Sequence, residues 1–269
     1  MNENQEQEIK KLLGNTAVIT GGGSGIGKAT AILLAQQGAN VCILERDNSR
    51  AQETKDEIES FGGSVLSLET DISDPKDVEY SFNQAVAKFG CLDIVFANAG
   101  INGILSSIEK MSAEEWSQTI DINLTGTFLT VKYAIPHLKN NGGSIIITSS
   151  INGNRIFSNF GFSAYSTSKA AQIAFMKMAA LELAQYRIRV NAICPGAIET
   201  QIDQTTEKSA GLDEIRIPVE FPDGDQPLAN QPGAAEQVAD LVLFLSSKDS
   251  SHITGTEIYI DGAESLLRG

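Results

Sequence analysis

Short, largely apolar segments alternate with helical patterns along almost the whole chain, and this alternation limits the fold more than any other feature. The apolar segments lie at residues 16–19, 41–44, 65–68, 93–97, 144–148, 189–194 and 257–260. Because their polar residues do not follow a period of two, each segment is expected to be a strand buried on both faces. Strands that alternate with helices form a parallel sheet covered on both sides. The sequence therefore predicts an α/β fold, a single doubly wound domain with a mostly parallel seven-stranded sheet.

The segments between the strands carry helix signals. Helices are expected at residues 28–37, 48–60, 74–89, 112–138, 165–185 and 234–246. Residues 1–13 are polar and predict a lead-in, so the domain is expected to cover 14–269. The pattern dissolves at about 200–233, where four prolines and many acids occur. A loop of that length is usually a functional lid or a disordered segment.

Three glycines, Gly21, Gly25 and Gly27, lie between the first strand and the first helix. Glycine allows a tight turn and a close approach of the backbone to a pyrophosphate, which the N–H groups at the helix start can bind. The spacing differs from the general dinucleotide fingerprint, and no P-loop lysine follows. With a strand before it and a helix after it, the loop favours a nucleotide site over a flexible turn.

Glu45 ends the second strand, 24 residues after Gly21, where an acid is expected to hold the adenosine ribose. Its carboxylate accepts hydrogen bonds from ribose hydroxyls and repels a 2′-phosphate. Ser24 supplies no positive charge, whereas the adjacent Arg46 argues the other way. The residues favour NAD as the cofactor, with NADP less favoured; a solvated strand-end acid is the simpler alternative.

Tyr165 and Lys169 are four residues apart at the start of a helical pattern, which puts both side chains on one face. A tyrosine has a pKa of about 10, and a nearby ammonium lowers it. The pair is therefore a candidate acid/base, although such spacing also occurs by chance on helices.

These motifs stand in the order found in the classical short-chain dehydrogenases/reductases, and the chain resembles that family from about Gly14 to Gly262. The shared motifs are residues 20–27, Asn98-Ala99-Gly100, Asn123, Ser150, Tyr165 with Lys169, and Pro195-Gly196. The resemblance implies a Rossmann-type fold and a hydride transfer between nicotinamide and a carbon that bears oxygen.

The resemblance also implies roles for individual residues. Tyr165 would be the general acid/base, and Lys169 would lower its pKa and hold the nicotinamide ribose. Ser150, rather than the neighbouring Ser149, would bind the substrate oxygen, and Asn123 would bind a water of a proton relay. The cofactor would contact Gly21, Ser24, Gly25, Ile26, Gly27, Glu45, Arg46, Asp71, Ile72, Asn98, Ala99, Gly100, Tyr165, Lys169, Pro195, Gly196, Ile198 and Thr200. No metal is expected.

The substrate is less constrained. Ser150 and Tyr165 are 15 residues apart, slightly more than is usual in the family, and the extra residues fall at about 154–160. Residues 199–231 are rich in acids, which makes a strongly anionic substrate less expected. Apolar residues predict a flap and a wall for the pocket: Ile202, Leu212, Ile215, Ile217, Val219 and Phe221, with Ile104, Phe157, Phe160 and Phe162. A small ketone or secondary alcohol, a 3-oxoacyl thioester, and a sugar or polyol all remain open.

The composition excludes several other classes. A net charge of −14 disfavours nucleic acid and anionic membrane surfaces as partners. No signal peptide and no apolar run of about 20 residues is found, which predicts a cytoplasmic protein without a membrane span. The resemblance implies a homo-oligomer, usually a tetramer. Two other functions are weighed against the NAD(P)(H)-dependent oxidoreductase: a non-catalytic NAD(H) sensor, and a sugar-nucleotide epimerase or dehydratase.

Overall fold

The computed structural model describes residues 10–200, 202, 206–215, 221 and 224–268. Its main sheet has seven strands in the order β3-β2-β1-β4-β6-β7-β9, and every pair is parallel. The strands are β1 (Thr16–Thr20), β2 (Asn40–Glu45), β3 (Val65–Glu69), β4 (Ile94–Ala97), β6 (Gly143–Thr148), β7 (Ile188–Pro195) and β9 (Glu257–Ile260). The predicted fold class is confirmed.

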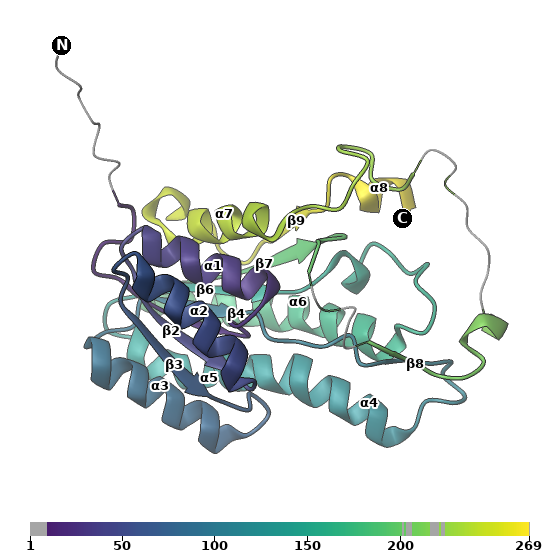
Figure 1. Cartoon of the computed structure of the whole chain (residues 1–269), viewed down its shortest axis with the longest axis horizontal. Coiled ribbons are helices and arrows are strands. Elements are labelled where there is room, and N and C mark those ends of the chain that lie inside the picture. The colour runs from purple at the N-terminus through teal and green to yellow at the C-terminus, as the bar shows by residue number, and fades with distance from the viewer. Residues whose placement is uncertain (1–9, 201, 203–205, 216–220, 222–223, 269) are drawn as a thin grey trace, which may run out of the picture.

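Helices cover both faces of this sheet (Figure 1). The α-helices of the described residues are α1 (Gly25–Gln36), α2 (Asn48–Ser60), α3 (Pro75–Phe89), α4 (Ala113–Ile120), α5 (Gly126–Leu138), α6 (Ser163–Leu183), α7 (Ala235–Ser246) and α8 (Glu264–Arg268), and all but α4 and α8 contribute to the cores on the two faces. Ile19 and Ile43 pack with α1, α2 and α7 on one face. Val18 and Leu44 pack with α3, α5 and α6 on the other. Both sides of β1 and β2 are therefore buried, which explains their continuous apolar sequence.

The strand order reverses between β1 and β4. From β1 the chain builds outward through β2 to β3, then returns to place β4 on the other side of β1. In open parallel sheets, ligands bind outside the carboxyl ends of the strands at such a reversal. The glycine loop follows β1 and the Asn98-Ala99-Gly100 segment follows β4, so the reversal brings these two motifs together.

The helix expected over 112–138 begins as predicted but is not a continuous α-helix. The Ser112 hydroxyl accepts from the Glu115 N–H, and the Glu115 carboxylate accepts from the Ser112 N–H, which completes a capping box. Between α4 and α5 the chain forms a π-helical turn, Asp121–Thr125. Such wider turns are frequent at functional sites. An apolar stripe does not reveal a turn that is wider by one residue.

Three local features were not predicted. Residues 104–105 and 207–208 pair as β5 (Ile104–Leu105) and β8 (Glu207–Lys208), so the 200–233 excursion is attached to the loop after β4. Helix α8 follows β9. Leu12, within the lead-in, is buried and its N–H donates to the carbonyl of Gln37. Ile217 and Val219 of the expected flap, and most of the lead-in, lie outside the described residues.

Candidate active site

The glycine loop has a backbone that requires glycine at two positions. Gly21 and Gly25 have positive φ angles of 68° and 49°. At Gly27 the constraint is contact, because an added Cβ would lie 2.0 Å from the carbonyl oxygen of Gly21. Helix α1 therefore starts directly against the loop, with Ser24 as its N-cap residue and no side-chain capping bond. This close approach is the geometry that a pyrophosphate site needs.

Thr20 and Asn98 lock the ends of neighbouring strands together. The Thr20 hydroxyl accepts from the backbone N–H groups of Asn98 and Ala99, both at 3.0 Å. The Asn98 amide donates to the Thr20 carbonyl at 3.2 Å, and its oxygen accepts from the Thr148 hydroxyl at 3.2 Å. β1, β4 and β6 are thereby fixed at the crevice. From sequence, Thr20 was noted only as the first residue of the 20–27 motif, and Thr148 only as the last residue of a strand.

Glu45 lies beside the glycine loop. Its carboxylate accepts from the N–H groups of Gly23 at 3.2 Å, Arg46 at 2.9 Å and Asp47 at 3.2 Å. Arg46 is exposed. A hydrogen bond from the Ser73 hydroxyl, and to a lesser extent the Arg46 charge, hold the pKa of Asp71 below its usual value. The positive charge of Arg46 therefore acts on Asp71.

Ile72 is buried, and its side chain fills the space that a Cβ on Gly126 would need. Ile26 is half-buried and packs against the core on the α1 side. These two residues of the expected cofactor contacts therefore support the walls of the crevice with apolar packing.

Asn123, in the π-helical turn, is fully buried, and its side chain makes three hydrogen bonds. It accepts from the Ile101 N–H at 2.8 Å and donates to the Ile101 carbonyl at 2.9 Å and to the Ser168 hydroxyl at 3.1 Å. A Cβ on Gly100 would lie 3.1 Å from its amide oxygen and 3.5 Å from Lys169 Nζ. The structure thus brings together Gly100, Asn123 and Lys169.

Tyr165 and Lys169 occupy successive turns near the start of α6. Lys169 Nζ lies 5.5 Å from the centroid of the Tyr165 ring and donates to the Thr148 carbonyl at 2.8 Å. Lys169 is only 3% exposed, and its burial lowers the pKa of the ammonium to about 8. The Phe162 ring meets the Tyr165 ring edge to face at 5.5 Å. The predicted pairing of the two side chains on one helix face is what the structure has.

The two candidate serines differ in what they contact. The Ser149 hydroxyl donates to the Lys169 carbonyl at 2.8 Å, so this donor is used inside the fold. The Ser150 hydroxyl accepts from the Asn152 N–H at 3.1 Å, which leaves its own proton available. Of the two, Ser150 is the better placed to donate to a ligand.

Sequence reasoning missed Gln172, one turn after Lys169. Its amide nitrogen donates to the Asn123 carbonyl at 2.7 Å and to the Thr127 hydroxyl at 2.8 Å, and the residue is 1% exposed. Its amide oxygen is buried with no hydrogen-bond partner among the described residues. The available signal was a long polar side chain within an otherwise apolar stretch of a core helix.

The end of β7 supplies the other side of the crevice. A Cβ on Gly196 would lie 2.7 Å from the Cβ of Asp261 and 2.8 Å from the Glu264 carboxylate, so Gly196 is closely packed. Pro195 ends β7 opposite Ile260, and Ile198 pairs with Gly233. Thr200 packs against the glycine loop, 3.2 Å from a Cβ built on Gly25.

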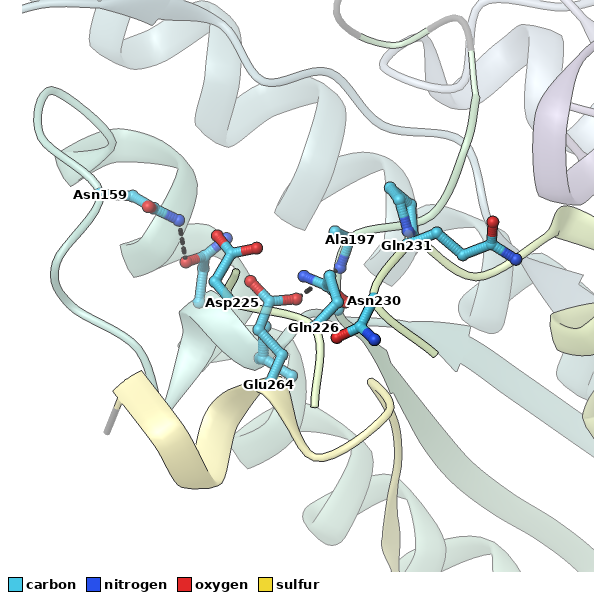
Figure 2. A pocket seen from close by; sticks show the side chains of 11 residues that line it. Asn159, Ala197, Asp225, Gln226, Asn230, Gln231 and Glu264 are labelled. Carbon is cyan, nitrogen blue, oxygen red and sulfur yellow. Dashed lines mark hydrogen bonds between the residues drawn. The ribbon is translucent and has the colours of Figure 1, made fainter. Parts of the chain in front are cut away.

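Two cavities in the described part of the chain adjoin these residues. One, of about 440 Å³, lies beside the glycine loop and is lined by Gly25, Lys28, Ala29, Ile32, Glu57, Glu199, Thr200, Ala234, Ala235 and Glu236. The other, of about 390 Å³, is shown in Figure 2 and lies beyond Ser150. The expected apolar wall does not line the second cavity; Phe157 is 71% exposed instead. The crevice, the close-packed glycines and the strand-end acid fit a dinucleotide.

Comparisons with known proteins agree with this geometry. A family model described as enoyl-(acyl carrier protein) reductase matches residues 21–263. Cyclohexanol dehydrogenase of Acinetobacter sp. (strain SE19) is 38% identical over 261 residues, covering 95% of this chain and 98% of that protein.

Two solved structures are similar over nearly the whole chain. A 3-ketoacyl-ACP reductase from Sinorhizobium meliloti 1021 is 46% identical with a TM-score of 0.88, covering 94% of this chain and 100% of that one. A 3-ketoacyl-(acyl-carrier-protein) reductase from Brucella melitensis, solved with NADH, is 31% identical with a TM-score of 0.83, covering 94% and 99%. This chain belongs to the classical short-chain dehydrogenases/reductases. It is an oxidoreductase that interconverts ketones and alcohols.

None of the helices in the described part of the chain is long and apolar enough to cross a membrane. Among the same residues, no group of three or more side chains is arranged to hold a metal ion.

Proposed function

We propose that Tyr165 is the proton donor and acceptor of an NAD-preferring reaction between a ketone and a secondary alcohol. The observation that carries the proposal is the buried Lys169 ammonium, 5.5 Å from the Tyr165 ring in a crevice built for a dinucleotide. A buried positive charge beside a phenol favours the phenolate. The pair is thus suited to proton transfer near neutral pH.

In the direction of reduction, the Tyr165 hydroxyl gives its proton to the ketone oxygen, and Ser150 donates a hydrogen bond to the same oxygen. The cofactor, when bound, supplies the hydride that reaches the carbonyl carbon. Lys169 stabilises the tyrosinate that remains until solvent returns the proton. In oxidation each residue performs the reverse step. Because the pKa of Lys169 is lowered to about 8, most of the ammonium is charged at neutral pH.

The proton relay through Asn123 remains a prediction, and the structure defines what it requires. Both amide N–H groups of the Asn123 side chain are used, its amide oxygen accepts from Ile101, and its backbone carbonyl already accepts from Gln172 and Thr127. A relay water on that carbonyl has to replace one of these donors. Gln172 is the candidate, because its amide comes from the same helix as Lys169.

The preference for NAD rests on Glu45. Its carboxylate lies against the glycine loop, where an adenosine ribose would bind, and its charge disfavours a 2′-phosphate. Arg46 follows Glu45 directly and favours NADP, and its charge acts on Asp71. The similar Brucella melitensis reductase was solved with NADH, which supports a cofactor of this kind.

Other properties stay predictions. The tetramer, the cytoplasmic location, and the division into a 1–13 lead-in and a 14–269 domain rest on the sequence reading. The acidic surface continues to argue against nucleic acid as a partner.

The test is Tyr165→Phe in the full-length protein. Loss of the proton donor is expected to reduce turnover by roughly 10²–10⁴-fold, while NADH binding, followed by fluorescence, stays within a few-fold of wild type. Tyr80→Phe is the matched control, since Tyr80 is 60% exposed on α3. A Tyr165→Phe protein that binds NADH and keeps wild-type turnover would show that another group moves the proton.

A further inference from the structure

The cavity beyond Ser150 is walled mainly by polar side chains. Its volume is about 390 Å³, within the range of small-molecule sites. It is lined by Ile151, Asn152, Asn159, Gly196, Ala197, Asp225, Gln226, Asn230, Gln231, Pro232 and Glu264. Figure 2 shows Asp225 and Glu264 between Asn159 on one side and Asn230 and Gln231 on the other. Five of these residues carry amides and two carry carboxylates, and none is a lysine, arginine or histidine.

This cavity adjoins the residues proposed to handle the substrate oxygen. Asn152, in its wall, donates its backbone N–H to the Ser150 hydroxyl at 3.1 Å. Gly196 and Ala197, in the opposite wall, directly follow the end of β7. A substrate whose reacting oxygen lies at Ser150 therefore has this cavity as a place for its remaining atoms.

Several of the polar groups are held in place before a ligand binds. The Asn159 amide donates to the Asn152 amide oxygen at 2.8 Å, which orients both side chains. Glu264 is 5% exposed, and its carboxylate accepts from the Ala197 N–H at 2.9 Å. With its oxygen engaged, Asn152 keeps its amide N–H groups for a ligand, since they make no hydrogen bond within the described residues.

The chemistry of this wall selects among substrates. Amides offer donors and acceptors, carboxylates offer acceptors only, and a hydroxyl group satisfies both. An apolar ring or acyl chain would cover the half-buried amides of Asn152, Asn159 and Gln226 without offering them partners, which costs binding free energy. A phosphate or carboxylate would face the carboxylates of Asp225 and Glu264, which are the charged side chains among the described residues of the wall.

We propose that the cavity binds the non-reacting part of a neutral substrate that carries several hydroxyl groups, a polyol, cyclitol or sugar. This inference rests on the proposed function, because it assumes that the reacting oxygen lies at Ser150 and Tyr165. It selects one of the substrate classes that the sequence left open. The apolar wall expected from Phe157 and Phe160 would have favoured a different class.

The test compares alcohols that share a carbon skeleton and differ in hydroxyl count. Cyclohexanol is paired with myo-inositol, and 2-hexanol with sorbitol, in NADH absorbance assays with NAD and NADP. In at least one pair, kcat/KM for the polyol is expected to exceed that for the simple alcohol by about tenfold or more. Inositol monophosphate is expected to be a poorer substrate than myo-inositol. Preference for the simple alcohol in both pairs, or for the phosphate, overturns the inference.

Variants connect the preference to the cavity. Asn159→Leu keeps the size of the side chain and removes its amide, so the ratio of kcat/KM for polyol over simple alcohol is expected to fall several-fold. Asn141→Leu makes the same chemical change on an exposed turn outside the cavity and is expected to leave that ratio unchanged. An equal ratio in wild type and Asn159→Leu contradicts the assignment of the cavity.

The two proposals fail in different ways. Turnover of the simple alcohols that depends on Tyr165, without any gain for polyols, overturns the substrate class and leaves the proposed function standing. Turnover that survives Tyr165→Phe, or no turnover of any member of the panel despite NADH binding, overturns both.

Discussion

The cofactor side and the substrate side of the crevice are built in different ways. On the cofactor side, three adjacent strands end together, and their ends are joined by hydrogen bonds of Thr20 and Asn98. On the substrate side, the cavity is assembled from four segments that are far apart in sequence, including the 225–232 part of the long excursion. On the cofactor side, backbone atoms of the glycine loop pack against other backbone atoms. On the substrate side, the wall consists of side chains that can be substituted without altering the sheet. A fold that keeps a dinucleotide site and varies its substrate is served by this division.

Glycine substitutions are expected to give the largest difference in NADH affinity between the cofactor side and the substrate side. In Gly27→Ala the new Cβ would lie 2.0 Å from the Gly21 carbonyl, a backbone atom that cannot move without the loop. We expect a lower melting temperature and a loss of NADH affinity of more than about 100-fold, from overpacking at the helix start.

Gly196→Ala is the matched variant on the substrate side. Its Cβ would lie 2.7 Å from the Cβ and 2.9 Å from the Cα of Asp261, and 2.8 Å from the Glu264 carboxylate, so the turn after β9 has to move while the glycine loop is not contacted. We expect NADH affinity within a few-fold of wild type and a raised KM for substrate. Equal losses of NADH affinity in the two glycine variants would remove the distinction between the sides.

Lys169→Met tests whether the buried ammonium of Lys169 lowers the stability of the folded protein. Burial lowers the pKa of Lys169 from 10.5 to about 8, so the unfolded chain binds more protons between these values. The free energy of unfolding of wild type should therefore rise across this pH range, by up to about 3 kcal/mol. Lys169→Met lacks this dependence and should be the more stable protein below pH 8, with turnover reduced at least about 100-fold.

The measurement is urea unfolding of both proteins without cofactor at several pH values, together with turnover. Lys177→Met is the control, because Lys177 lies on the same helix and is half exposed. A Lys169→Met protein that is less stable than wild type at neutral pH would mean that the ammonium stabilises the fold.

The difference between the two sides also explains what the sequence could predict. Gly21, Glu45 and Asn98 act through positions at strand ends, and strand ends can be located from apolar segments. Tyr165 and Lys169 follow from helical spacing. The π-helical turn at Asn123 was missed, because a turn that is wider by one residue leaves the apolar stripe nearly intact.

On the substrate side the sequence predicted less. The cavity brings together Asn152 and Asn159, from the segment after β6, and Glu264, from the short helix α8. Loop paths and short helices leave no periodic pattern in the sequence, so this meeting could not be predicted. The apolar residues of the 154–162 segment suggested a wall, yet Phe157 faces solvent. Gln172 is a polar residue in an apolar stretch of α6, and that signal does not say what the side chain contacts; its hydrogen bonds to Asn123 and Thr127 are visible only in the structure.

Glu45→Gln tests the cofactor side without disturbing its backbone. The amide keeps the shape of the carboxylate and removes the charge that disfavours a 2′-phosphate. We expect the ratio of kcat/KM with NADP over NAD to rise by about tenfold, which corresponds to about 1.4 kcal/mol. Steady-state assays with both cofactors measure it. Glu69→Gln, at the exposed end of the neighbouring strand, should change the ratio little; a similar rise there would indicate a general charge effect.

Gln172→Met is expected to have the smallest effect, and it decides how far the proton path extends along α6. The substitution removes two hydrogen bonds of the amide but also its buried, unpaired oxygen, so the two costs offset each other. We expect a change in unfolding free energy of less than about 1 kcal/mol. If a water takes the place of the amide on the Asn123 carbonyl, turnover should stay within about threefold, with the pH profile unchanged. A large fall in kcat at constant KM, recovered in Gln172→Glu, would instead place the amide itself in the path that returns protons to Tyr165. The residues that take part in catalysis would then include Gln172, which lies neither at a strand end nor in the glycine loop.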